Sequence, residues 1–427
     1  MQNYFISKIF NLLKKIIFNI KILFSVVFWK YLFNLKNFKT KNNRNIFIFD
    51  NFEALNNTLF RAIYLPYISN LLNCKLFYIN YKFNPIFKLI YLRIGSNKLD
   101  INLNVNQKEE HQKLLEDFFL KSVSKKDILD YEIDQINIGL DIYESYLIKY
   151  KQPTIKKINF KNNELYLVVS NALKYFIFWR DFIKLNKNKI QGVLLSHRNY
   201  IETNILNRLS IKNQIRVYSL TGDGTSILRW KNISLNFFKY YQDIFNTLDF
   251  EEKKTAISWS QDRLKLRFDG EVGVDMQYSS KSAYKKKNLI NQIRNSPRIK
   301  ILICSSCFFD NPHCYGKMMF EDFYECLKFL GKISHQTNYD WYIKPHPDYL
   351  PGTIEVLNEC RLFFSNLEII SADTSFHNLK TKINYAITTY GSIGHELPLL
   401  GIPVINCSNI NPHQNYEFNF TPKNKID

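Results

Sequence analysis

Short apolar runs alternate with longer stretches of helical character along most of the chain. The apolar runs are rich in Ile, Val, Phe and Tyr, which is typical of buried strands. This alternation predicts an α/β fold with parallel, doubly wound sheets. We expect strands over 45–50, 76–79, 193–195, 216–220, 299–304, 340–343, 367–370, 384–388 and 403–405. We expect helices over 55–72, 107–123, 140–150, 200–209, 319–334 and 375–381, and another opened by Gly391 and Ser392.

The strands fall into two groups, and a chain of 427 residues is too long for one ordinary core. Residues 251–296 are charged and lack clear periodicity, which we interpret as an interdomain segment. We therefore predict one α/β domain over 45–285 and a second over 286–427. The stretch over 100–190 is polar and helical, and the pattern alone does not determine the order of its elements.

The first 44 residues differ from the rest. Residues 4–36 are apolar and aromatic, but lysines at positions 8, 14, 15, 21 and 30 interrupt them. The uninterrupted apolar run of a membrane span or of a signal peptide is missing. We predict a basic amphipathic helix on a membrane surface, followed by a linker up to residue 44. The alternative is a helix that packs on the protein's own core. The membrane reading implies a peripheral protein at the inner face of the cytoplasmic membrane.

The composition is that of a globular protein, with 46% hydrophobic and 22% charged residues. The formal net charge is +20, but Asn, Lys, Ile, Tyr and Phe dominate throughout, so the charge reflects a general bias. It is weak support for nucleic-acid binding, and we expect no nucleic-acid partner. A basic surface also suits an anionic membrane or an anionic sugar nucleotide.

The seven cysteines form no regular framework, and an odd count argues against a secreted disulfide scaffold. Cys304, Cys307, His313 and Cys314 could be drawn as a zinc site. However, Cys304 ends an apolar strand and no second CxxC exists, so we expect no metal. The chain also lacks GxGxxG after a strand, the P-loop pattern and HExxH, and we expect no cofactor.

The candidate chemistry follows two predicted strands near the end of the chain. Lys344-Pro345-His346-Pro347 follows the first, and Thr388-Thr389-Tyr390-Gly391-Ser392-Ile393-Gly394-His395-Glu396 follows the second. Ligands bind at such strand ends in open α/β sheets. Lys344 offers a point charge for a phosphate, and His346 offers a hydrogen-bond donor or an acid. The alternative for this segment is a surface turn.

The second segment offers glycines and hydroxyls. Gly391 and Gly394 permit close backbone approach, and Ser392 can cap the following helix while its hydroxyl faces a phosphate. Glu396 could accept hydrogen bonds from a ribose. The alternatives are an ordinary N-cap for Ser392 and an ordinary solvated acid for Glu396.

Two further loops come earlier in the chain. The strand over 193–195 would deliver Ser196, His197 and Arg198 at its carboxyl end. The strand over 216–220 ends in Thr221-Gly222-Asp223-Gly224-Thr225. Arg198 could bind an anionic sugar or its carboxylate. The alternatives for His197 and Arg198 are a strand-end hydrogen bond and a surface charge.

These motifs support a resemblance to a known family. The matching stretches are 310–313, 320–323, 341–347, 388–398 and 401–403, within a matched region of about 297–420. They resemble bacterial capsule polysaccharide biosynthesis proteins, which are similar to GT-B glycosyltransferases of the Kdo-transferase-like and sialyltransferase-like kinds that use CMP-sugars. The resemblance implies two Rossmann-like domains facing a cleft, with the donor nucleotide held by the C-terminal domain.

The resemblance also implies roles for particular residues. The family's HP motif falls on His346 and Pro347, and its Ser/Thr phosphate motif on Ser392 with Thr389. An acidic-Asp-Gly motif that supplies a catalytic base in related transferases is replaced here by Gly222-Asp223-Gly224, which lacks the first acid. GT-B enzymes commonly end with helices that cross back to the first domain, so we expect that this closing element is absent or that the chain is truncated.

We therefore expect a metal-independent, membrane-associated glycosyltransferase of capsule or surface-polysaccharide synthesis in the cell envelope. It would transfer sugar from a nucleotide-activated donor, with CMP as the implied nucleotide, to a saccharide or lipid-linked acceptor. The expected catalytic residues are Asp223, His197 and His346. The expected substrate-binding residues are Lys344, His346, Thr389, Gly391, Ser392, Glu396, Arg198 and His313.

Two alternatives stay open. The first is a phosphotransferase of the teichoic-acid type that uses a CDP-activated polyol. It would need a second histidine in a matching loop, for which His313 or His395 could serve. The second is a non-catalytic subunit that binds or assembles polysaccharide.

Overall fold

The computed structural model describes residues 44–51, 55–79, 85–196, 198–220, 227–230, 241–274, 279–285, 292–408, 410–414 and 416–426. The predicted membrane-surface helix lies outside these residues. The chain divides into two compact units built from interleaved segments. The first unit takes its described residues from 1–116 and 170–233, and the second from 117–169 and 234–427. One sheet lies on each side of the predicted domain boundary at 285–286.

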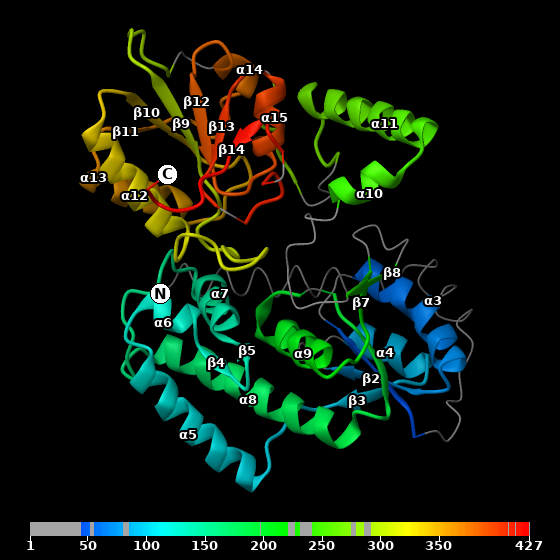
Figure 1. Ribbon diagram of the computed structural model, residues 1–427. Coiled ribbons are helices and arrows are strands. Elements are labelled where there is room, and N and C mark those ends of the chain that lie inside the picture. The colour runs from blue at the N-terminus through cyan, green and yellow to red at the C-terminus, as the bar shows by residue number, and fades with distance from the viewer. Residues whose placement is uncertain are drawn as a thin grey trace. The chain divides into compact units, whose positions relative to one another are not determined.

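The first unit is built on a six-stranded sheet with the order β3-β2-β1-β6-β7-β8 (Figure 1). The strands are β1 (Ile46–Asp50), β2 (Lys75–Ile79), β3 (Asn97–Leu99), β6 (Ile190–Leu194), β7 (Val217–Leu220) and β8 (Ile227–Trp230). All neighbours pair in parallel except β7 and β8, which pair antiparallel. Counted in chain order, this is the 3-2-1-4-5-6 arrangement of a Rossmann sheet.

Helices connect the parallel strands of this sheet. They are α3 (Leu55–Leu71), α4 (Pro85–Arg93) and α9 (Tyr200–Lys212). The apolar residues over 87–92 lie within α4. The core under α3 and α4 is strongly aromatic, with Phe47, Phe49, Tyr78 and Tyr91 buried together. Because helices cover such sheets, their strands are apolar on both faces rather than alternating.

A buried charge network closes the carboxyl end of the central strand β1. Asp50 and Arg61 are both fully buried, and a guanidinium nitrogen lies 2.7 Å from the Asp50 carboxylate. The second carboxylate oxygen accepts hydrogen bonds from the backbone N–H and the hydroxyl of Ser196, at 2.7 and 2.9 Å. Asp50 therefore joins β1 to the loop after β6, at the position where the strand order reverses.

The second unit is built on another six-stranded sheet, with the order β11-β10-β9-β12-β13-β14. Its strands are β9 (Lys300–Cys304), β10 (Asp340–Lys344), β11 (Leu367–Ile369), β12 (Tyr385–Thr388), β13 (Val404–Asn406) and β14 (Asn419–Phe420). All neighbouring strands are parallel. The order is again 3-2-1-4-5-6, so the predicted α/β class with two Rossmann-like sheets is confirmed.

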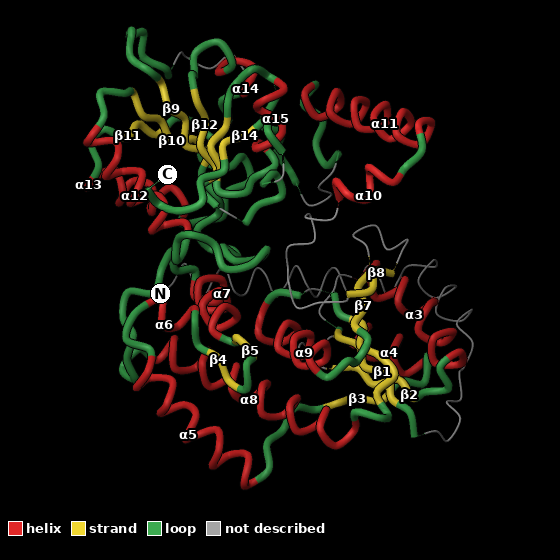
Figure 2. Tube along the Cα trace, in the orientation of Figure 1, coloured by secondary structure: helices red, strands yellow, loops and turns green. Residues whose placement is uncertain are grey.

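Side chains of this second sheet alternate between two helical layers. Ile301, Ile303 and Trp341 pack against α12 (Phe323–Gln336) and α13 (Thr353–Phe363). Leu302 and Tyr342 face the opposite way, toward α14 (Phe376–Leu379) and α15 (Ile393–Leu399). Figure 2 shows the strands between these helices. The sheet is thereby covered on both faces, which leaves the strand ends as the place for a ligand.

The polar middle of the chain is helical, as its pattern indicated. Its elements are α5 (Val105–Lys121), α6 (Lys125–Leu129), the antiparallel pair β4 (Glu132–Ile133) and β5 (Ile136–Asn137), α7 (Gly139–Tyr150) and α8 (Asn163–Asn186). The residues over 117–169 belong to the second unit. There the hydroxyl of Tyr143 donates to the buried carboxylate of Asp322, 2.5 Å away, and Lys125 pairs with Glu325. This segment therefore packs on the start of α12.

Residues 251–296 contain more structure than their sequence pattern indicated. They include most of α11 (Phe250–Phe268), which follows the short α10 (Tyr241–Thr247). Asp249 and Glu252 form a capping box at the start of α11. No residue of α11 is fully buried, which explains why its sequence carries no apolar stripe.

Among the described residues, no helix is both long enough and apolar enough to span a membrane. The same residues contain no group of three or more His, Cys, Asp or Glu side chains placed to hold a metal ion. Cys304 is a buried core residue at the end of β9.

The buried network at Asp50 gives a stability prediction. Asp50→Ala would leave the Arg61 charge buried without its carboxylate, which typically costs about 3–5 kcal/mol. We expect urea unfolding, followed by circular dichroism, to show a loss of this size. The control is Asp100→Ala, which breaks the exposed Lys98–Asp100 pair and should cost less than about 1 kcal/mol. Equal midpoints for the two variants would contradict the assigned role of Asp50.

Candidate functional site

Three loops meet at the carboxyl edge of the second sheet. They follow β9, β10 and β12, which are neighbours in the order β10-β9-β12. The strand order reverses between β9 and β12, and ligands of open α/β sheets bind in the crevice at such a reversal. The two motif segments of the sequence analysis are the loops after β10 and β12. The loop after β9, which begins with Ser305 and Ser306, joins them.

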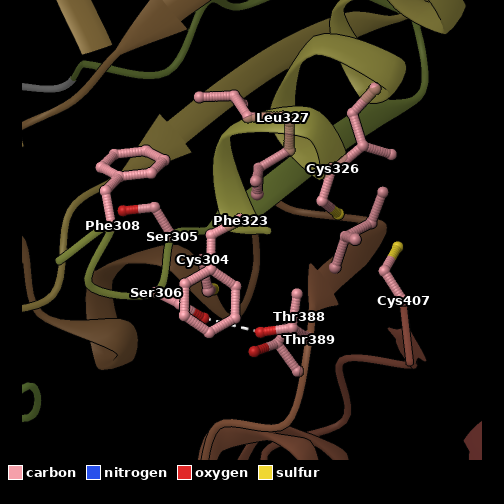
Figure 3. A pocket seen from close by; sticks show the side chains of 13 residues that line it. Cys304, Ser305, Ser306, Phe308, Phe323, Cys326, Leu327, Thr388, Thr389 and Cys407 are labelled. Carbon is pink, nitrogen blue, oxygen red and sulfur yellow. Dashed lines mark hydrogen bonds between the residues drawn. The ribbon is translucent and has the colours of Figure 1, made fainter. Parts of the chain in front are cut away.

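Hydroxyl groups gather between the loops after β9 and β12. The Ser306 and Thr389 hydroxyl oxygens are 2.6 Å apart, and Figure 3 shows them facing each other. The Ser305 hydroxyl is buried and has no hydrogen-bond partner among the described residues. A cavity of about 30 Å³ adjoins these groups. Its lining residues are Ile303, Cys304, Ser305, Ser306, Phe308, Phe323, Cys326, Leu327, Leu330, Ile387, Thr388, Thr389 and Cys407.

The loop after β12 is fixed by close backbone contacts. The Gly391 N–H donates to the Thr388 hydroxyl at 3.3 Å, and its carbonyl accepts from His413 at 3.2 Å. A Cβ atom at Gly394 would lie only 2.4 Å from the His413 ring. The close approach that the sequence predicted for Gly394 is thus an approach to the protein itself. The Tyr390 hydroxyl donates to the Asn311 carbonyl at 2.7 Å, which ties this loop to the loop after β9.

His346 is exposed, and its hydrogen bonding defines its tautomer. Its Nδ1 accepts from the backbone N–H of Asp348 at 3.1 Å. The neutral ring therefore carries its proton on Nε2, which can donate to a ligand. Desolvation by the surrounding protein lowers the pKa of His346, and the charges of Lys344 and Arg267 lower it further, although Asp348 opposes them. The ring is neutral at pH 7 and acts there as a hydrogen-bond donor.

The Asp348 carboxylate is in turn held by residues 279–285. It accepts from the backbone N–H groups of Ser280 and Lys281, at 2.9 and 3.2 Å, and from the Ser280 hydroxyl. These hydrogen bonds lower the pKa of Asp348 and keep it charged, although its partial burial opposes the shift. The segment after α11 thus fixes the loop that carries His346.

Lys344 lies in a different environment from the one that its motif suggested. Its side chain is 2% exposed. Its Nζ donates to the Ala372 carbonyl at 2.7 Å and lies 4.9 Å from the centre of the Phe376 ring. Burial lowers the pKa of Lys344 to about 8, and Asp373 opposes this shift. Its ammonium group is therefore held inside the protein and is not presented to solvent at the edge of the sheet.

Glu396 and Ser392 are joined by an arginine from α11. The Arg267 Nε donates to the Glu396 carboxylate at 2.6 Å, and a terminal guanidinium nitrogen donates to the Ser392 hydroxyl at 3.2 Å. The other carboxylate oxygen of Glu396 accepts from the Tyr284 hydroxyl. Glu396 is fully buried, so it is neither a solvated acid nor open to a ribose in this state. Ser392 opens α15 without a side-chain cap, so its hydroxyl is not an ordinary N-cap.

His313 is buried within the loop after β9. Its Nδ1 accepts from the Met318 N–H at 3.1 Å, and its Nε2 donates to the Glu321 carbonyl at 3.0 Å. Its backbone N–H donates to Glu144 at 2.8 Å. Burial lowers the pKa of His313 to about 4, so the ring is neutral. Both ring nitrogens are used by the backbone, which makes His313 a residue that shapes its loop.

The remaining candidates belong to the first unit. Arg198 is buried, and its guanidinium carbon lies 3.2 Å from the centre of the Trp230 ring. Burial lowers the pKa of Arg198 to about 10, which leaves it charged at pH 7. His197 and Asp223 lie outside the described residues. Their roles stay predictions from the sequence.

Sequence reasoning missed several residues of this edge. Ser305 and Ser306 directly follow a predicted strand, and the rule that selected the other two loops could have found them. Asp348 follows the KPHP segment directly, which was a usable signal. Arg267 and Tyr284 had no such signal, since each lies far along the chain from Glu396.

No protein-family model matches the chain, and no curated protein matches it. Among solved structures it is similar to KpsC, a beta Kdo 2,4 transferase from Thermosulfurimonas dismutans, at 13% identity over 56% of this chain and 75% of that chain, with a TM-score of 0.35. It is also similar to a glycosyltransferase from Rickettsia africae, at 11% identity over 90% and 86% of the two chains, with a TM-score of 0.26. A third similar structure is the UDP-GlcNAc 2-epimerase of Neisseria meningitidis. It is 11% identical over 84% of this chain and 81% of that chain, with a TM-score of 0.22. At such identities and scores these similarities identify neither a family nor a function.

Lys344 gives a prediction on the pH dependence of stability. Its pKa falls from 10.5 in the unfolded chain to about 8 in the folded protein, so the unfolded chain binds more protons between these values. Stability relative to Lys344→Met should therefore rise by roughly 3 kcal/mol between pH 7.5 and 10.5. Urea unfolding of both proteins across this range measures the difference, which cancels the titration of other groups. A difference independent of pH would show that Lys344 is not buried as a charge.

Proposed function

We propose that the chain is a GT-B-type glycosyltransferase that binds a nucleotide-activated sugar at the carboxyl edge of the β9–β14 sheet. The observation that carries this proposal is the meeting of three loops where the strand order reverses. The loops after β9 and β12 bring the hydroxyl groups of Ser306 and Thr389 together, and the loop after β10 carries the Nε2–H of His346 at the same edge of the sheet. Directed donors of this kind suit the oxygens of a phosphate group.

The chemistry required of this site is stabilisation of a leaving group. When the bond between sugar and phosphate breaks, negative charge grows on the phosphate oxygens. Fixed donors aimed at that charge are usually the largest contribution to catalysis. His346 would hydrogen-bond to the departing phosphate through Nε2. Ser392 and Thr389 would supply hydroxyls beside it, and the Gly391 backbone would allow close approach.

The residues that would activate and bind the acceptor belong to the first unit. Asp223 or His197 would remove the proton of the acceptor hydroxyl as a general base, and Arg198 would bind an anionic sugar. These roles come from the sequence and its resemblance to capsule polysaccharide biosynthesis proteins. The same resemblance supports a CMP-sugar donor and a saccharide or lipid-linked acceptor. Attachment to a membrane through the N-terminal helix rests on the lysine-interrupted apolar pattern of residues 4–36.

The buried position of His313 gives no support to the competing phosphotransferase reading. That reading needed a second histidine with a ring nitrogen open to the donor. Both ring nitrogens of His313 bond to the backbone instead. That reading then rests on His395, and we favour transfer of a sugar because of the resemblance of the motifs to capsule polysaccharide biosynthesis proteins.

The central test is nucleotide binding that depends on His346. We expect CMP, CDP or UDP to bind the protein, with the affinity lowered roughly 10- to 100-fold in His346→Ala, as for a lost hydrogen bond to a charged group. Calorimetric titration with each nucleotide measures this. The control is His335→Ala, because His335 is another exposed histidine of the same unit, on α12. Absence of binding by the wild-type protein would count against a nucleotide-dependent function.

Incubation with nucleotide-activated donors then identifies the product. Mass spectrometry of an oligosaccharide acceptor should show the added mass of a sugar. Addition of glycerol phosphate, without any sugar, would overturn the glycosyltransferase proposal in favour of the phosphotransferase.

A further inference from the structure

Arg267 is the described cation that combines exposure with contact to the loop after β12. Among the described residues, the charges of Lys344 and Arg267 both lower the pKa of His346. The Lys344 ammonium is buried against the Ala372 carbonyl. The Arg267 side chain is 19% exposed. Within the described part of the chain, Arg267 therefore presents its charge to a ligand at this edge more directly than Lys344 does.

The position of Arg267 is set by a buried carboxylate. The Glu396 side chain is 1% exposed and needs a counter-ion, because an unpaired charge is costly inside a protein. One oxygen accepts from Arg267 and the other from Tyr284, so each oxygen of the carboxylate has a partner. A second contact fixes the same end of α11. The His377 ring bonds to the Phe268 carbonyl at 2.7 Å.

A counter-ion role alone does not account for the geometry of Arg267. A guanidinium has five N–H hydrogens, and among the described residues Glu396 and Ser392 accept one hydrogen bond each. The contact with the Ser392 hydroxyl holds a terminal guanidinium nitrogen beside the loop after β12. Further N–H hydrogens remain for a ligand on the exposed side of the group. The planar fork of arginine matches the oxygens of a phosphate.

We propose that Arg267 binds a phosphate group of the ligand at this site, with Glu396 and Tyr284 as its positioning residues. This inference rests on the proposed function, because it concerns the same edge of the same sheet. Arg267 would contact the phosphate beside Ser392, and His346 would contact it from the loop after β10. The end of α11 would thereby form part of the site, although α11 lies outside the region that resembles capsule proteins.

The test separates binding of phosphate from balancing of a buried charge. Arg267→Gln alone leaves Glu396 unpaired and would destabilise the fold. The double variant Arg267→Gln with Glu396→Gln removes both charges and should restore the melting temperature. We expect the double variant to bind CMP and UDP roughly 10- to 100-fold more weakly than the wild type. Arg267→Lys keeps the positive charge but lacks the planar guanidinium. Its affinity for CMP and UDP should lie between those of the wild type and the double variant.

Two matched controls define the outcome. Arg263→Gln changes another arginine of α11, one turn earlier, which stacks on Trp259, and it should bind CMP and UDP like the wild type. Cytidine and uridine carry no phosphate, so their affinities should not change in any variant. Inorganic pyrophosphate serves as a probe of the anion site without a base.

Each result supports or overturns a defined statement. Wild-type affinity of the double variant for CMP and UDP would overturn the role of Arg267 and leave the proposed function standing. Binding of pyrophosphate through Arg267 without any binding of nucleotides would support the anion site and overturn the proposed function. Absence of binding to nucleotides and to pyrophosphate alike in the wild type would overturn both.

Discussion

The parallel pairing of β9 with β10 on one side and β12 on the other is the constraint on which the second unit depends. Parallel strands end at a common edge, and each must be followed by a crossover that returns to the opposite edge. The crossover after β9 leads to β10 and the crossover after β12 leads to β13, so the two run in opposite directions along the sheet. Open α/β sheets have their ligand crevice at such a reversal, which lies here between β9 and β12. Segments from distant parts of the sequence are brought together there by the topology of the sheet.

Glu396 converts this crevice into an ordered site. A carboxylate buried in α15 without partners would destabilise the fold. The Glu396 carboxylate pairs with Arg267 from α11 and accepts a hydrogen bond from Tyr284 in the following segment. That segment also supplies the N–H groups that hold Asp348, and Asp348 fixes the tautomer of His346. A chain of polar contacts thus runs from the loop after β12 to the loop after β10 through residues outside both. The segment between the strand groups, which was predicted to be only an interdomain segment, therefore contributes contacts to both loops.

The sequence was sufficient for features that depend on local pattern. Apolar runs such as 299–304 and 384–388 predicted strands correctly, because a strand buried on both faces needs continuous hydrophobicity. The rule that ligands meet strand ends selected two loops, around His346 and Ser392, that the structure places directly after β10 and β12. The sequence did not predict the burial of charged side chains that are covered by residues distant along the chain. Lys344 and Glu396 look like solvated charges in the sequence, and only the tertiary fold shows that Phe376 and Tyr284 cover them. Helix α11 went unseen because a helix without a buried face leaves no apolar stripe.

The charges at this edge argue against recognition by a general positive field. The net charge of the chain is +20, but Lys344 directs its ammonium inward and Glu396 offsets Arg267. His346 is neutral at pH 7, and Asp348 adds a negative charge beside it. Among the described residues, Lys344 and Arg267 therefore offer an approaching anion charges that already have partners. Such an anion meets instead a set of N–H and O–H groups whose directions are fixed by the fold. Such a site favours a ligand whose oxygens fit those directions, and it discriminates by geometry where a lysine-rich surface would discriminate only by charge.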